Sequence, residues 1–387
     1  MPINRRRFVL FGGLALGAAA TTALSCTRSI FANAVGANED RANEGGDARG
    51  KEQSHSSLAD SNAQANDVFE KKAVGPEGLF APQRGDIRIA IISDLNNAYG
   101  ATDYLPEVIQ GVALLPDWQP DLVLCGGDMV AGQSLDLSKA QIEAMWAAFD
   151  EQILDPIRSA QLPFAVTVGN HDASSYQNNG EFVYVLDRQA TARYWAGHQS
   201  DTDLTFIEAA AFPFHYSFKQ NNIFYLVWDA SSANIPAEQV AWADSALSSP
   251  EAQSAERRIV MGHLPLYAVA QKRDRPGEFL NQADELRALL ERHQVHTYIS
   301  GHHHAYFPGK VGQLEMLHAG ALGSGPKQLL ASAAAPFQTL TIMDLFLDTA
   351  STVYTTYNMN TMDVVDPQLL PTEIVSPNGR ELRQDLA

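Results

Sequence analysis

The sequence predicts an α/β protein whose strands deliver polar residues to a shared edge. Three observations support this: short β-branched runs recur, amphipathic stretches at helical spacing separate them, and most runs stop at a glycine or an acidic residue. The run 164–168 stops at Gly169-Asn170-His171-Asp172. An amide, an imidazole and a carboxylate in a row offer a metal ligand, a proton carrier and a group that orients the ring. Taken alone, the string is equally compatible with a polar turn.

The predicted elements follow in a regular order. Strands are expected at 87–92, 121–125, 164–168, 214–218, 223–228, 258–261 and 297–300, and the alternating stretch 340–357 is expected to be sheet. Helices are expected from Pro106, where proline fits a first turn, and at 138–160, 238–247 and 284–293. The apolar residues of 138–160 are interpreted as core. The segment after Asp172 is long for a connection, which is typical of functional segments.

The composition limits the class of protein. The chain has 387 residues, 45% of them hydrophobic, and a net charge of −18. Its length allows one large domain or two ordinary ones. Because nucleic acids and anionic membranes are bound through Lys and Arg, no nucleic-acid-binding surface is expected. A phosphate-bearing substrate would need a local positive centre.

The first residues resemble a twin-arginine export signal. Asn4-Arg5-Arg6-Arg7-Phe8 precedes an apolar run that reaches about Leu24. Ala32-Asn33-Ala34 is a candidate cleavage site, so 1–34 is interpreted as a signal peptide. Lipidation at Cys26 or a retained leader would instead tether the protein to a membrane. The expected partner is the twin-arginine export machinery, and the expected location is periplasmic or extracellular.

Domain organisation follows from the composition along the chain. Residues 35–84 are polar and lack apolar periodicity, which predicts a disordered linker. Residues 85–358 form the predicted folded domain, and 359–387 are expected to be a peripheral tail. Cys26 lies in the leader, so Cys125, inside an apolar strand, is interpreted as a buried inert thiol without a disulfide partner.

Five predicted strands end in residues that can bind metals. If parallel strands lie side by side, their carboxyl ends open onto one edge and these side chains converge there. Carboxylate, amide and imidazole together suit Mn, Fe or Zn, because imidazole favours transition metals. Glycines before most of them let the backbone turn tightly. The residues are Asp94, Asp128, Asn170, His263, and the pair His302 and His304.

The order of these motifs resembles the calcineurin-like metallophosphoesterase superfamily over roughly 87–357. The motifs are Asp94-x-Asn96, Gly127-Asp128, Gly169-Asn170-His171-Asp172, Gly262-His263 and Gly301-His302-x-His304. The resemblance implies two mixed β-sheets packed face to face between helical layers. It also implies a di-metal hydrolase that cleaves a phosphomonoester or phosphodiester through a metal-bridged hydroxide. Together with the leader, this predicts an exported enzyme.

Residue roles are also implied by this resemblance. Asp128 would bridge two ions, with Asp94 and His304 at the first ion. Asn170, His263 and His302 would complete the second. His171, ordered by Asp172, would stabilise the phosphoryl oxygens or protonate the leaving oxygen. Arg188, Arg193 and Tyr306 are candidate substrate contacts, His318 is a candidate for supporting the site, and His303 is expected to point away from it.

One position departs from the family pattern. The family usually has histidine where this chain has Asn96, and an amide oxygen binds transition metals more weakly than imidazole. The first ion would then be looser or assisted by Asn97 or Tyr99. The purple acid phosphatase variant has a tyrosine ligand where this chain has Ala131.

Two alternatives remain open from the sequence. The first is a catalytically impaired metal-binding envelope protein, with Asn96 as the lesion, which would not need His171 or Asp172. The second is a membrane-tethered interaction module that uses residues 35–84, which explains the leader but none of the candidate ligands.

Overall fold

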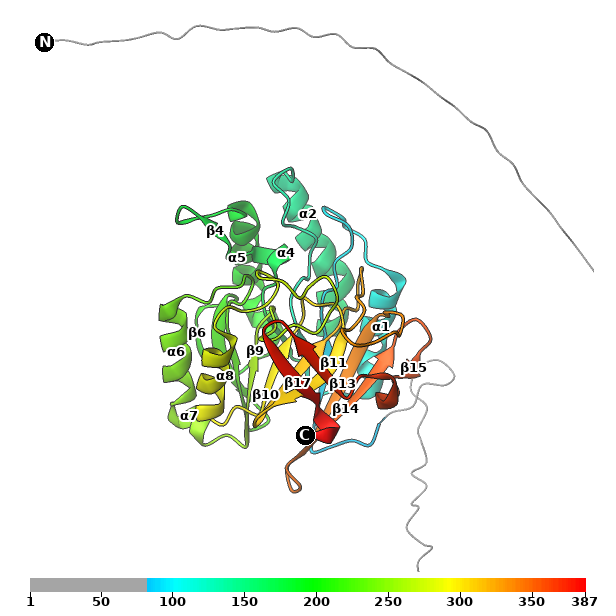
Figure 1. The fold of residues 1–387 in the computed structure, drawn as a ribbon. Coiled ribbons are helices and arrows are strands. Elements are labelled where there is room, and N and C mark those ends of the chain that lie inside the picture. The colour runs from blue at the N-terminus through cyan, green and yellow to red at the C-terminus, as the bar shows by residue number, and fades with distance from the viewer. Residues whose placement is uncertain (1–81) are drawn as a thin grey trace, which may run out of the picture. The chain divides into compact units, whose positions relative to one another are not determined.

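The computed structural model describes residues 82–387, all of which lie in one of the two compact units of the chain (Figure 1). The predicted signal peptide and residues 35–81 of the predicted linker lie outside the described residues. No helix within 82–387 has both the length and the apolar character needed to cross a membrane.

The first β-sheet has six strands in the order β15-β14-β13-β1-β2-β3. β1, β2 and β3 run parallel, and β13 pairs antiparallel with the other side of β1. The strands are β1 (Ile87–Ile92), β2 (Leu122–Cys125), β3 (Phe164–Val166), β13 (Thr339–Phe346), β14 (Ser351–Asn358) and β15 (Asp363–Val364).

The second sheet has nine strands in the order β16-β17-β11-β12-β10-β9-β8-β7-β6. Its centre, β8-β9-β10-β12, is parallel. The strands are β6 (Phe206–Ala211), β7 (His215–Gln220), β8 (Ile223–Val227), β9 (Arg257–Met261), β10 (Thr297–Ser300), β11 (Tyr306–Val311), β12 (Leu314–Ala319), β16 (Glu373–Ser376) and β17 (Gly379–Arg383).

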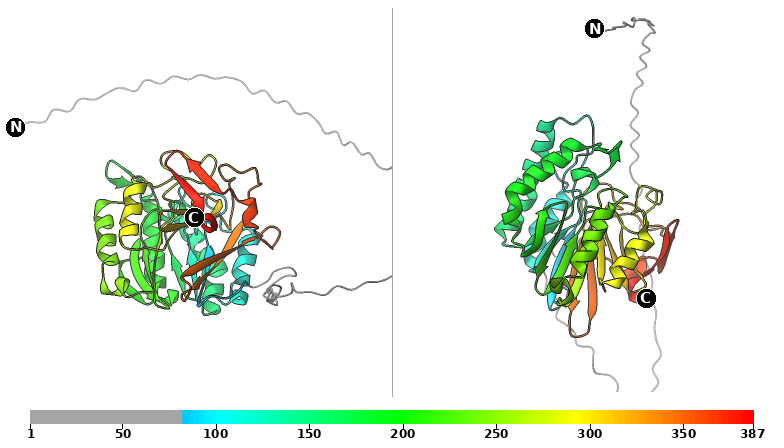
Figure 2. Two further views of the ribbon diagram at one scale, coloured as in Figure 1. Left: turned by 60° about the horizontal axis from the view of Figure 1, so that its bottom comes forward. Right: turned by 90° about the vertical axis from the view of Figure 1, so that its left-hand side faces the viewer.

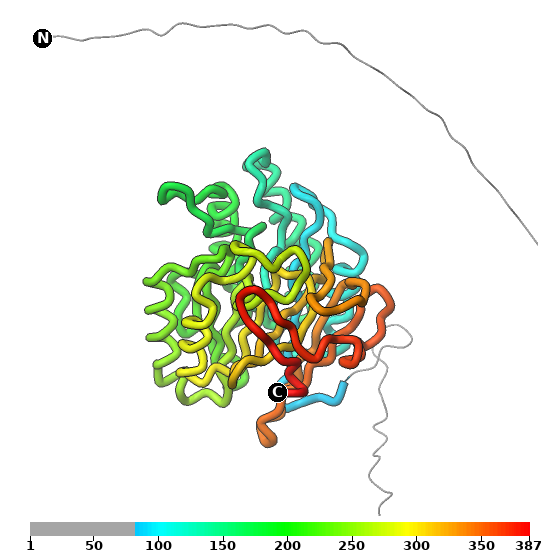
Figure 3. The backbone as a smooth tube through the Cα atoms, in the orientation of Figure 1, coloured from blue at the N-terminus to red at the C-terminus, as the bar shows by residue number. Residues whose placement is uncertain are grey.

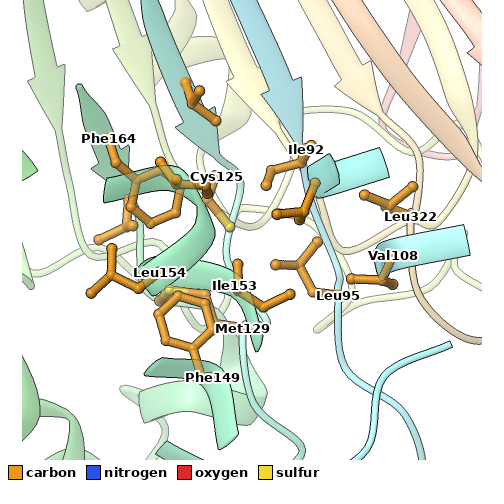
Figure 4. Close-up of a cluster of buried hydrophobic side chains, with 14 of the residues drawn as sticks. Ile92, Leu95, Val108, Cys125, Met129, Phe149, Ile153, Leu154, Phe164 and Leu322 are labelled. Atoms are coloured by element: carbon orange, nitrogen blue, oxygen red, sulfur yellow. The ribbon is translucent and has the colours of Figure 1, made fainter. Parts of the chain in front are cut away.

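Helices cover the outer face of each sheet, so the predicted four-layer α/β/β/α fold is confirmed (Figure 2). On the first sheet lie α1 (Pro106–Trp118), α2 (Lys139–Phe149), α3 (Asp155–Ser159) and α5 (Val185–His198). On the second sheet lie α6 (Ala237–Leu247), α7 (Pro250–Gln253) and α8 (Ala283–Arg292). Figure 4 shows part of the core beneath the first helical layer, which includes Ile92 and Phe164 of the strands and Phe149 of α2.

Strand β1 shows why the strands are continuous apolar runs. Ile87, Ile89 and Ile91 pack between the two sheets, whereas Ala90 and Ile92 pack under the helices. Since both faces of the sheet are covered, apolar residues are favoured on both faces of the strand rather than at alternate positions only. The exception in β1 is Arg88, which is buried and paired with Asp344 of β13.

Two predicted elements differ in detail. The expected helix 138–160 is α2 followed by a π-helical turn, Asp150–Leu154, and then α3, whose second residue is Pro156. Proline lacks an N–H and cannot continue a regular α-helical ladder, which accounts for the break. Asp172 itself lies in the short helix α4 (Asn170–Ala173). The loose segment that follows contains the hairpin of β4 (Gln177–Asn178) and β5 (Glu181–Phe182), and α5.

The expected peripheral tail is an integral part of the sheets, which corrects the prediction. β15 extends the first sheet, and the hairpin β16–β17 (red in Figure 3) pairs with β11 at the edge of the second. Val365, Leu370 and Ile374 are buried in the core between the sheets. The prolines of this segment predicted turns. Its strands could not be predicted, because a strand of two to five residues carries little periodic signal.

Candidate metal centre

The predicted ligands meet where the carboxyl ends of the two sheets lie together. Three come from the first sheet: Asp94 follows β1, Asp128 follows β2 and Asn170 follows β3. His263 follows β9, and His302 and His304 follow β10 of the second sheet. The first sheet therefore supplies the oxygen donors and the second sheet supplies the imidazoles, instead of one sheet edge supplying both.

Asp94 and His304 form one half of the cluster. His304 Nε2 lies 3.2 Å from Asp94 Oδ1, and the Asp94 side chain is fully buried. Ser93 Oγ donates to Asp94 Oδ2 over 2.6 Å, and the backbone N–H of His302 donates to Asp94 Oδ1 over 3.1 Å. These bonds join the end of β1 to the end of β10 and fix the carboxylate.

The other half surrounds Asn170. Its side-chain oxygen lies 3.0 Å from His263 Nε2 and 2.8 Å from His302 Nδ1. His263 Nε2 also lies 3.3 Å from Asp128 Oδ2. Ligand atoms of Asp94, Asp128 and His263 all lie within 4.8 Å of one another. The carboxylate of Asp128 thus lies between the two halves.

Each imidazole is held by the ring nitrogen that faces away from the cluster. His263 Nδ1 lies 2.7 Å from Gly126 O, and His304 Nδ1 lies 3.0 Å from Gly325 O. His302 differs, because its outer Nε2 lies 3.1 Å from Glu278 Oε2. Carbonyl oxygens only accept hydrogen bonds, so the outer nitrogens of His263 and His304 carry protons, and the inner nitrogen of each ring presents a lone pair when the ring is neutral. The outer Nε2 of His302 also lies 3.3 Å from Arg273 Nη1.

The cluster holds its carboxylates ionised although they are buried. Burial acts to raise the pKa of Asp128, but His263 and His171 outweigh it and keep this pKa below its usual value. Burial acts to lower the pKa of His263, but Asp128 and Asp94 outweigh it and raise the pKa to about 9. The proton on His263 thus compensates part of the charge of the two carboxylates. A metal ion that replaces this proton would have to supply the positive charge instead, since two buried carboxylates with neutral imidazoles carry a charge of −2.

His171 faces the cluster without belonging to the ligand set. Its Nδ1 lies 3.0 Å from Gly132 O, and its Nε2 lies 4.0 Å from Asp128 Oδ2. The ring is therefore oriented by its bond to Gly132 O, and the expectation of a direct bond from Asp172 to the ring is wrong. Successive side chains of a helix point in different directions. The Asp172 carboxylate instead accepts the N–H groups of Val130 and Gly169, over 2.9 and 2.8 Å.

Four predicted ligands have an uncommon backbone conformation. Asp94, Asp128, His302 and His304 have positive φ angles, between 51° and 62°. Non-glycine residues rarely adopt this left-handed conformation, and such strain concentrates at functional sites. The surrounding hydrogen bonds hold these residues there.

In the first motif, Asp94-x-Asn96, the role of Asn96 as a metal ligand is left to experiment. Asn96 is buried, and its backbone N–H donates to Asp128 O over 3.1 Å, which keeps it beside the cluster. Its role as a ligand stays a prediction. Asn97 donates to Asp103, and the ring of Tyr99 packs 5.2 Å from the ring of His171 with 64% of the residue exposed. Tyr99 therefore lies on the rim next to His171.

The predicted substrate contacts lie in three different places. Arg188 pairs with Asp229 in the wall of a cavity that is described below. Arg193 faces Glu143 of α2 on the outer helical layer, at 3.6 Å, and not the cluster. Tyr306 is buried among apolar residues between the two sheets. The prediction is wrong in placing Arg193 and Tyr306 at the site, because residue type alone does not show which face of an element they occupy.

Three further residues were considered from the sequence. His318 does not support the cluster, since its Nε2 bonds the buried Glu381 of β17 at 3.0 Å. His303 points away from the cluster as expected, accepting the N–H of Val269 and bonding Glu278 O. Cys125 is buried, and burial raises the pKa of its thiol well above the usual value, as expected for an inert thiol.

Two residues of the site escaped the sequence analysis. Glu278 bonds His302, and Gln133 Oε1 accepts the side-chain N–H of Asn170 over 2.7 Å, which fixes the amide so that its oxygen faces the imidazoles. Both lie in irregular loops without periodicity or a motif. No signal in the sequence marks them.

The donor set fits two metal ions. Carboxylate oxygens, an amide oxygen and three imidazole lone pairs point to one buried cluster, and the outer nitrogens are already bound. This is the arrangement by which proteins prepare histidines for metals. Mixed oxygen and nitrogen donors suit transition ions.

Comparison with known proteins agrees with this geometry. A family model described as calcineurin-like phosphoesterase matches residues 87–306, more than half of the chain. No curated protein matches the sequence.

Solved structures are similar to the chain at low identity, and the first of them shares its fold. A purple acid phosphatase from yellow lupin (Lupinus luteus) seeds is 16% identical, with a TM-score of 0.52 over 74% of this chain and 54% of the lupin protein. The chain thus spans about half the length of that relative. GAP50, the anchor in the inner membrane complex of Plasmodium, is 14% identical, with a TM-score of 0.44 over 72% and 87% of the two chains. YfcE, a phosphoesterase from E. coli, is 10% identical, with a TM-score of 0.29 over 71% and 100%.

Proposed function

The chain belongs to the calcineurin-like phosphoesterase family, and we propose that it hydrolyses a phosphomonoester or phosphodiester with the aid of two metal ions. The observation that carries this proposal is the hydrogen bonding of the imidazoles. His263, His302 and His304 are each held by the outer nitrogen. The inner nitrogens of His263 and His304 face the buried carboxylates of Asp128 and Asp94, and that of His302 faces the amide oxygen of Asn170.

The assignment of ligands follows the two halves of the cluster. Asp94 and His304 would hold one ion, with Asn96 as a possible weak addition. Asn170, His263 and His302 would hold the other, and Asp128 lies between both groups. Bound metal ions supply positive charge that polarises a phosphoryl group and makes an attacking water molecule more acidic. Mn, Fe and Zn are the candidates for these ions.

The residues of the chain contribute orientation and a proton position. His171 Nδ1 donates to Gly132 O, so Nε2 is the nitrogen that faces the substrate side. When the ring carries its second proton, Nε2 can donate to a phosphoryl oxygen or give that proton to the leaving oxygen. The backbone N–H of His171 donates to Asp128 Oδ1 over 2.8 Å, which holds the residue beside the carboxylate that lies between the two halves of the cluster. Asp172 is a positioning residue, because it fixes the turn that carries His171.

The alternative is a metal-binding protein with impaired catalysis because of Asn96. The position of His171 favours the enzyme, since a passive metal binder has no use for an imidazole that faces the cluster but stands 4.0 Å from the nearest carboxylate oxygen. We also propose export through the twin-arginine machinery, on the strength of the residues Asn4 to Phe8 alone.

The test combines metal content with turnover. Elemental analysis of the mature protein is expected to give two ions per chain, and chelation is expected to abolish hydrolysis of p-nitrophenyl phosphate or bis-p-nitrophenyl phosphate. The ratio of the two rates separates a monoesterase from a diesterase. Absence of turnover of both compounds after Mn, Fe and Zn are restored would replace the enzyme with the impaired metal binder.

Two histidine variants separate metal binding from catalysis. His263→Ala is expected to lose one ion and nearly all activity. His171→Ala is expected to keep both ions and to lose about 10²- to 10⁴-fold in kcat, the range for a general acid or base. His198→Ala, at the end of α5 and paired with Asp150, is the control and is expected to leave both readouts unchanged. Full activity in His263→Ala would contradict the ligand assignment.

A further inference from the structure

A cavity of about 460 Å³ lies beside the candidate metal centre. Its walls come from the β4–β5 hairpin, from α5, from the turn between β6 and β7, and from the segment that joins β8 to α6. None of its lining residues is a predicted metal ligand. The only one that the sequence analysis singled out as a substrate contact is Arg188.

The register of the second sheet places this cavity at the same edge as the cluster. Val227 of β8 pairs with Met261 of β9 in parallel, so Asp229 and His263, each two residues further along, leave the sheet at the same level. His215 begins β7, the next strand over. Neighbouring strands are about 5 Å apart, so the cavity wall begins roughly 5–10 Å from His263.

The chain also connects the cavity directly to the turn that carries His171. Helix α4 ends at Ala173, and Ser175, two residues later, lines the cavity. The carbonyl oxygen of Ala173 accepts bonds from Arg188 Nη1 and Ser231 Oγ, over 2.6 and 3.1 Å. One continuous, hydrogen-bonded wall thus runs from the cluster into the cavity.

The guanidinium of Arg188 is bound to other groups of the cavity wall. Its Nη1 bonds Ala173 O, its Nη2 bonds Asp229 Oδ2 over 2.9 Å, and the rings of Phe182 and Phe214 lie 4.3 and 4.2 Å from the guanidinium. Only 12% of its side chain is exposed. Among the described residues that line the cavity, Arg188 is the only Lys or Arg. Because its guanidinium already bonds the wall, the lining offers no free positive charge to a ligand that carries an anionic group besides the phosphoryl group.

The remaining polar groups of the lining favour neutral or cationic ligands. Glu238 is exposed, and its carboxylate has no hydrogen-bond or ion-pair partner within residues 82–387. Burial lowers the pKa of His215, so its ring is neutral at pH 7. With Arg188 at +1 and Asp229 and Glu238 at −1 each, the lining carries a net charge of −1. Tyr176 adds an exposed aromatic ring.

We propose that this cavity binds the leaving group of the phosphate ester and favours a ring-bearing group that is neutral or positively charged over one that carries a second phosphate or a carboxylate. The proposal rests on the proposed function, because the metal centre must hold the phosphoryl group for the leaving group to reach the cavity.

The test uses four esters that share the same phosphoryl group. Three are phenyl phosphates whose para position carries an aminoethyl, an ethyl or a carboxyethyl group, and the fourth is methyl phosphate; the corresponding methyl diesters serve if the protein is a diesterase. Among the phenyl esters, kcat/KM is expected to be highest for the aminoethyl ester, which carries an ammonium group. It is expected to be intermediate for the neutral ethyl ester and lowest for the carboxyethyl ester, which carries a carboxylate. Methyl phosphate is hydrolysed without help from the cavity.

Two variants change the cavity without touching the cluster. Glu238→Gln is expected to reduce the ratio of kcat/KM for the aminoethyl ester to kcat/KM for the carboxyethyl ester by about fivefold or more. The kcat/KM for methyl phosphate is expected to stay unchanged. Ala211→Leu, at the cavity wall, is expected to lower kcat/KM for all three phenyl esters by about tenfold relative to methyl phosphate. The matched controls are Glu251→Gln on α7 and Ala241→Leu on the exposed side of α6, which lie outside the lining.

The outcomes separate the two proposals. Turnover by the wild-type protein together with unchanged ester preferences in both cavity variants overturns the leaving-group subsite and leaves the proposed function standing. No turnover of any ester by the metal-loaded wild-type protein overturns both. If Ala211→Leu does not fold, the exposed Glu238→Gln alone decides, because loss of its charge discrimination is specific to the cavity.

Discussion

At the scale of single residues, the histidines of the cluster differ in what holds their outer nitrogen. His263 and His304 bond backbone carbonyls, whereas His302 bonds the carboxylate of Glu278. A backbone carbonyl is fixed by the fold, but a carboxylate is fixed only by its own partners. Glu278 is held by Arg273 and Arg275, and the orientation of His302 therefore depends on side chains alone.

Glu278→Ala is therefore expected to weaken metal binding at the half of the cluster that contains His302. Losing the bond at Nε2 frees the ring to rotate and lowers its basicity, and changes of this kind typically cost 10- to 100-fold in metal affinity. Calorimetric titration of the metal-free protein measures the affinity of each ion. Glu278→Gln, which keeps an oxygen acceptor, is expected to recover part of the loss.

The control is Arg275→Gln. Arg275 pairs with Glu278 but its side chain is 73% exposed, so this ion pair is expected to contribute little. An equal loss of metal affinity in Arg275→Gln and Glu278→Ala would show that the loop, and not the bond to His302, matters.

At the scale of elements, the strand ends are packed so closely that glycine is required beside the ligands. A Cβ at Gly301 would lie 2.2 Å from Ser93 Oγ and 2.6 Å from Asp94 Oδ2, and a Cβ at Gly169 would lie 2.1 Å from Asp128 Oδ1. The glycines before His302 and Asn170 thus let β10 and β3 approach carboxylates that follow other strands. The close approach, more than a special φ angle, explains these motif glycines.

Gly301→Ala is expected to destabilise the protein by about 1–3 kcal/mol, the usual cost of overpacking a buried position. It is also expected to displace Asp94 and so to weaken metal binding. Thermal unfolding with and without chelator measures the two effects separately.

A second glycine provides the matched comparison. Gly197 lies in α5 with no atom within 4 Å of a built Cβ, so Gly197→Ala is expected to stabilise the helix by about 1 kcal/mol. Equal stability of the two alanine variants would contradict the argument from close packing.

At the scale of the whole molecule, the cluster and the C-terminal hairpin connect parts that are distant in sequence. His263 bonds Gly126 O across the two sheets, and Asp94 accepts the N–H of His302. At the far edge of the second sheet, the His318–Glu381 pair joins β12 to β17, with each residue only 1% exposed. The last strands are therefore part of the folded unit.

Glu381→Ala is expected to cost about 1–3 kcal/mol of unfolding free energy, because it leaves a buried imidazole nitrogen without its hydrogen-bond partner. Urea denaturation followed by fluorescence measures this cost. Glu373→Ala in the neighbouring strand removes an exposed pair with Arg380 and is expected to cost less than about 1 kcal/mol. A small effect of Glu381→Ala would mean that the hairpin docks without this pair.

Export is the remaining prediction for the whole chain. Replacing Arg5 and Arg6 by lysine is expected to leave the precursor in the cytoplasm, because the paired arginines are the feature that the export machinery reads. Cell fractionation measures the distribution, with Arg28→Lys, downstream of the apolar run, as the control. Unchanged export of the double variant would remove the twin-arginine interpretation.

Several features of the site could be predicted from the sequence because they repeat a local pattern. An apolar run followed by a glycine and a polar residue marked the strand ends at Asp128, Asn170, His263 and His302. Glu278 and Gln133 could not be predicted, since a loop residue gains its role from a neighbour that is distant in sequence. The same reason explains why Arg193 was assigned to the site although it packs on α2.

The sequence by itself determined the α/β class, the family, and the candidate ligands at the strand ends. These depend on periodicity and on motifs within a few residues. Tertiary structure alone decided that oxygen donors come from one sheet and imidazoles from the other, that Gly132 and not Asp172 orients His171, and that the C-terminal segment completes the second sheet. The physical reason is that hydrogen bonds and packing across the two sheets join residues up to about two hundred positions apart, such as Asp94 and His302, and no local pattern encodes these contacts.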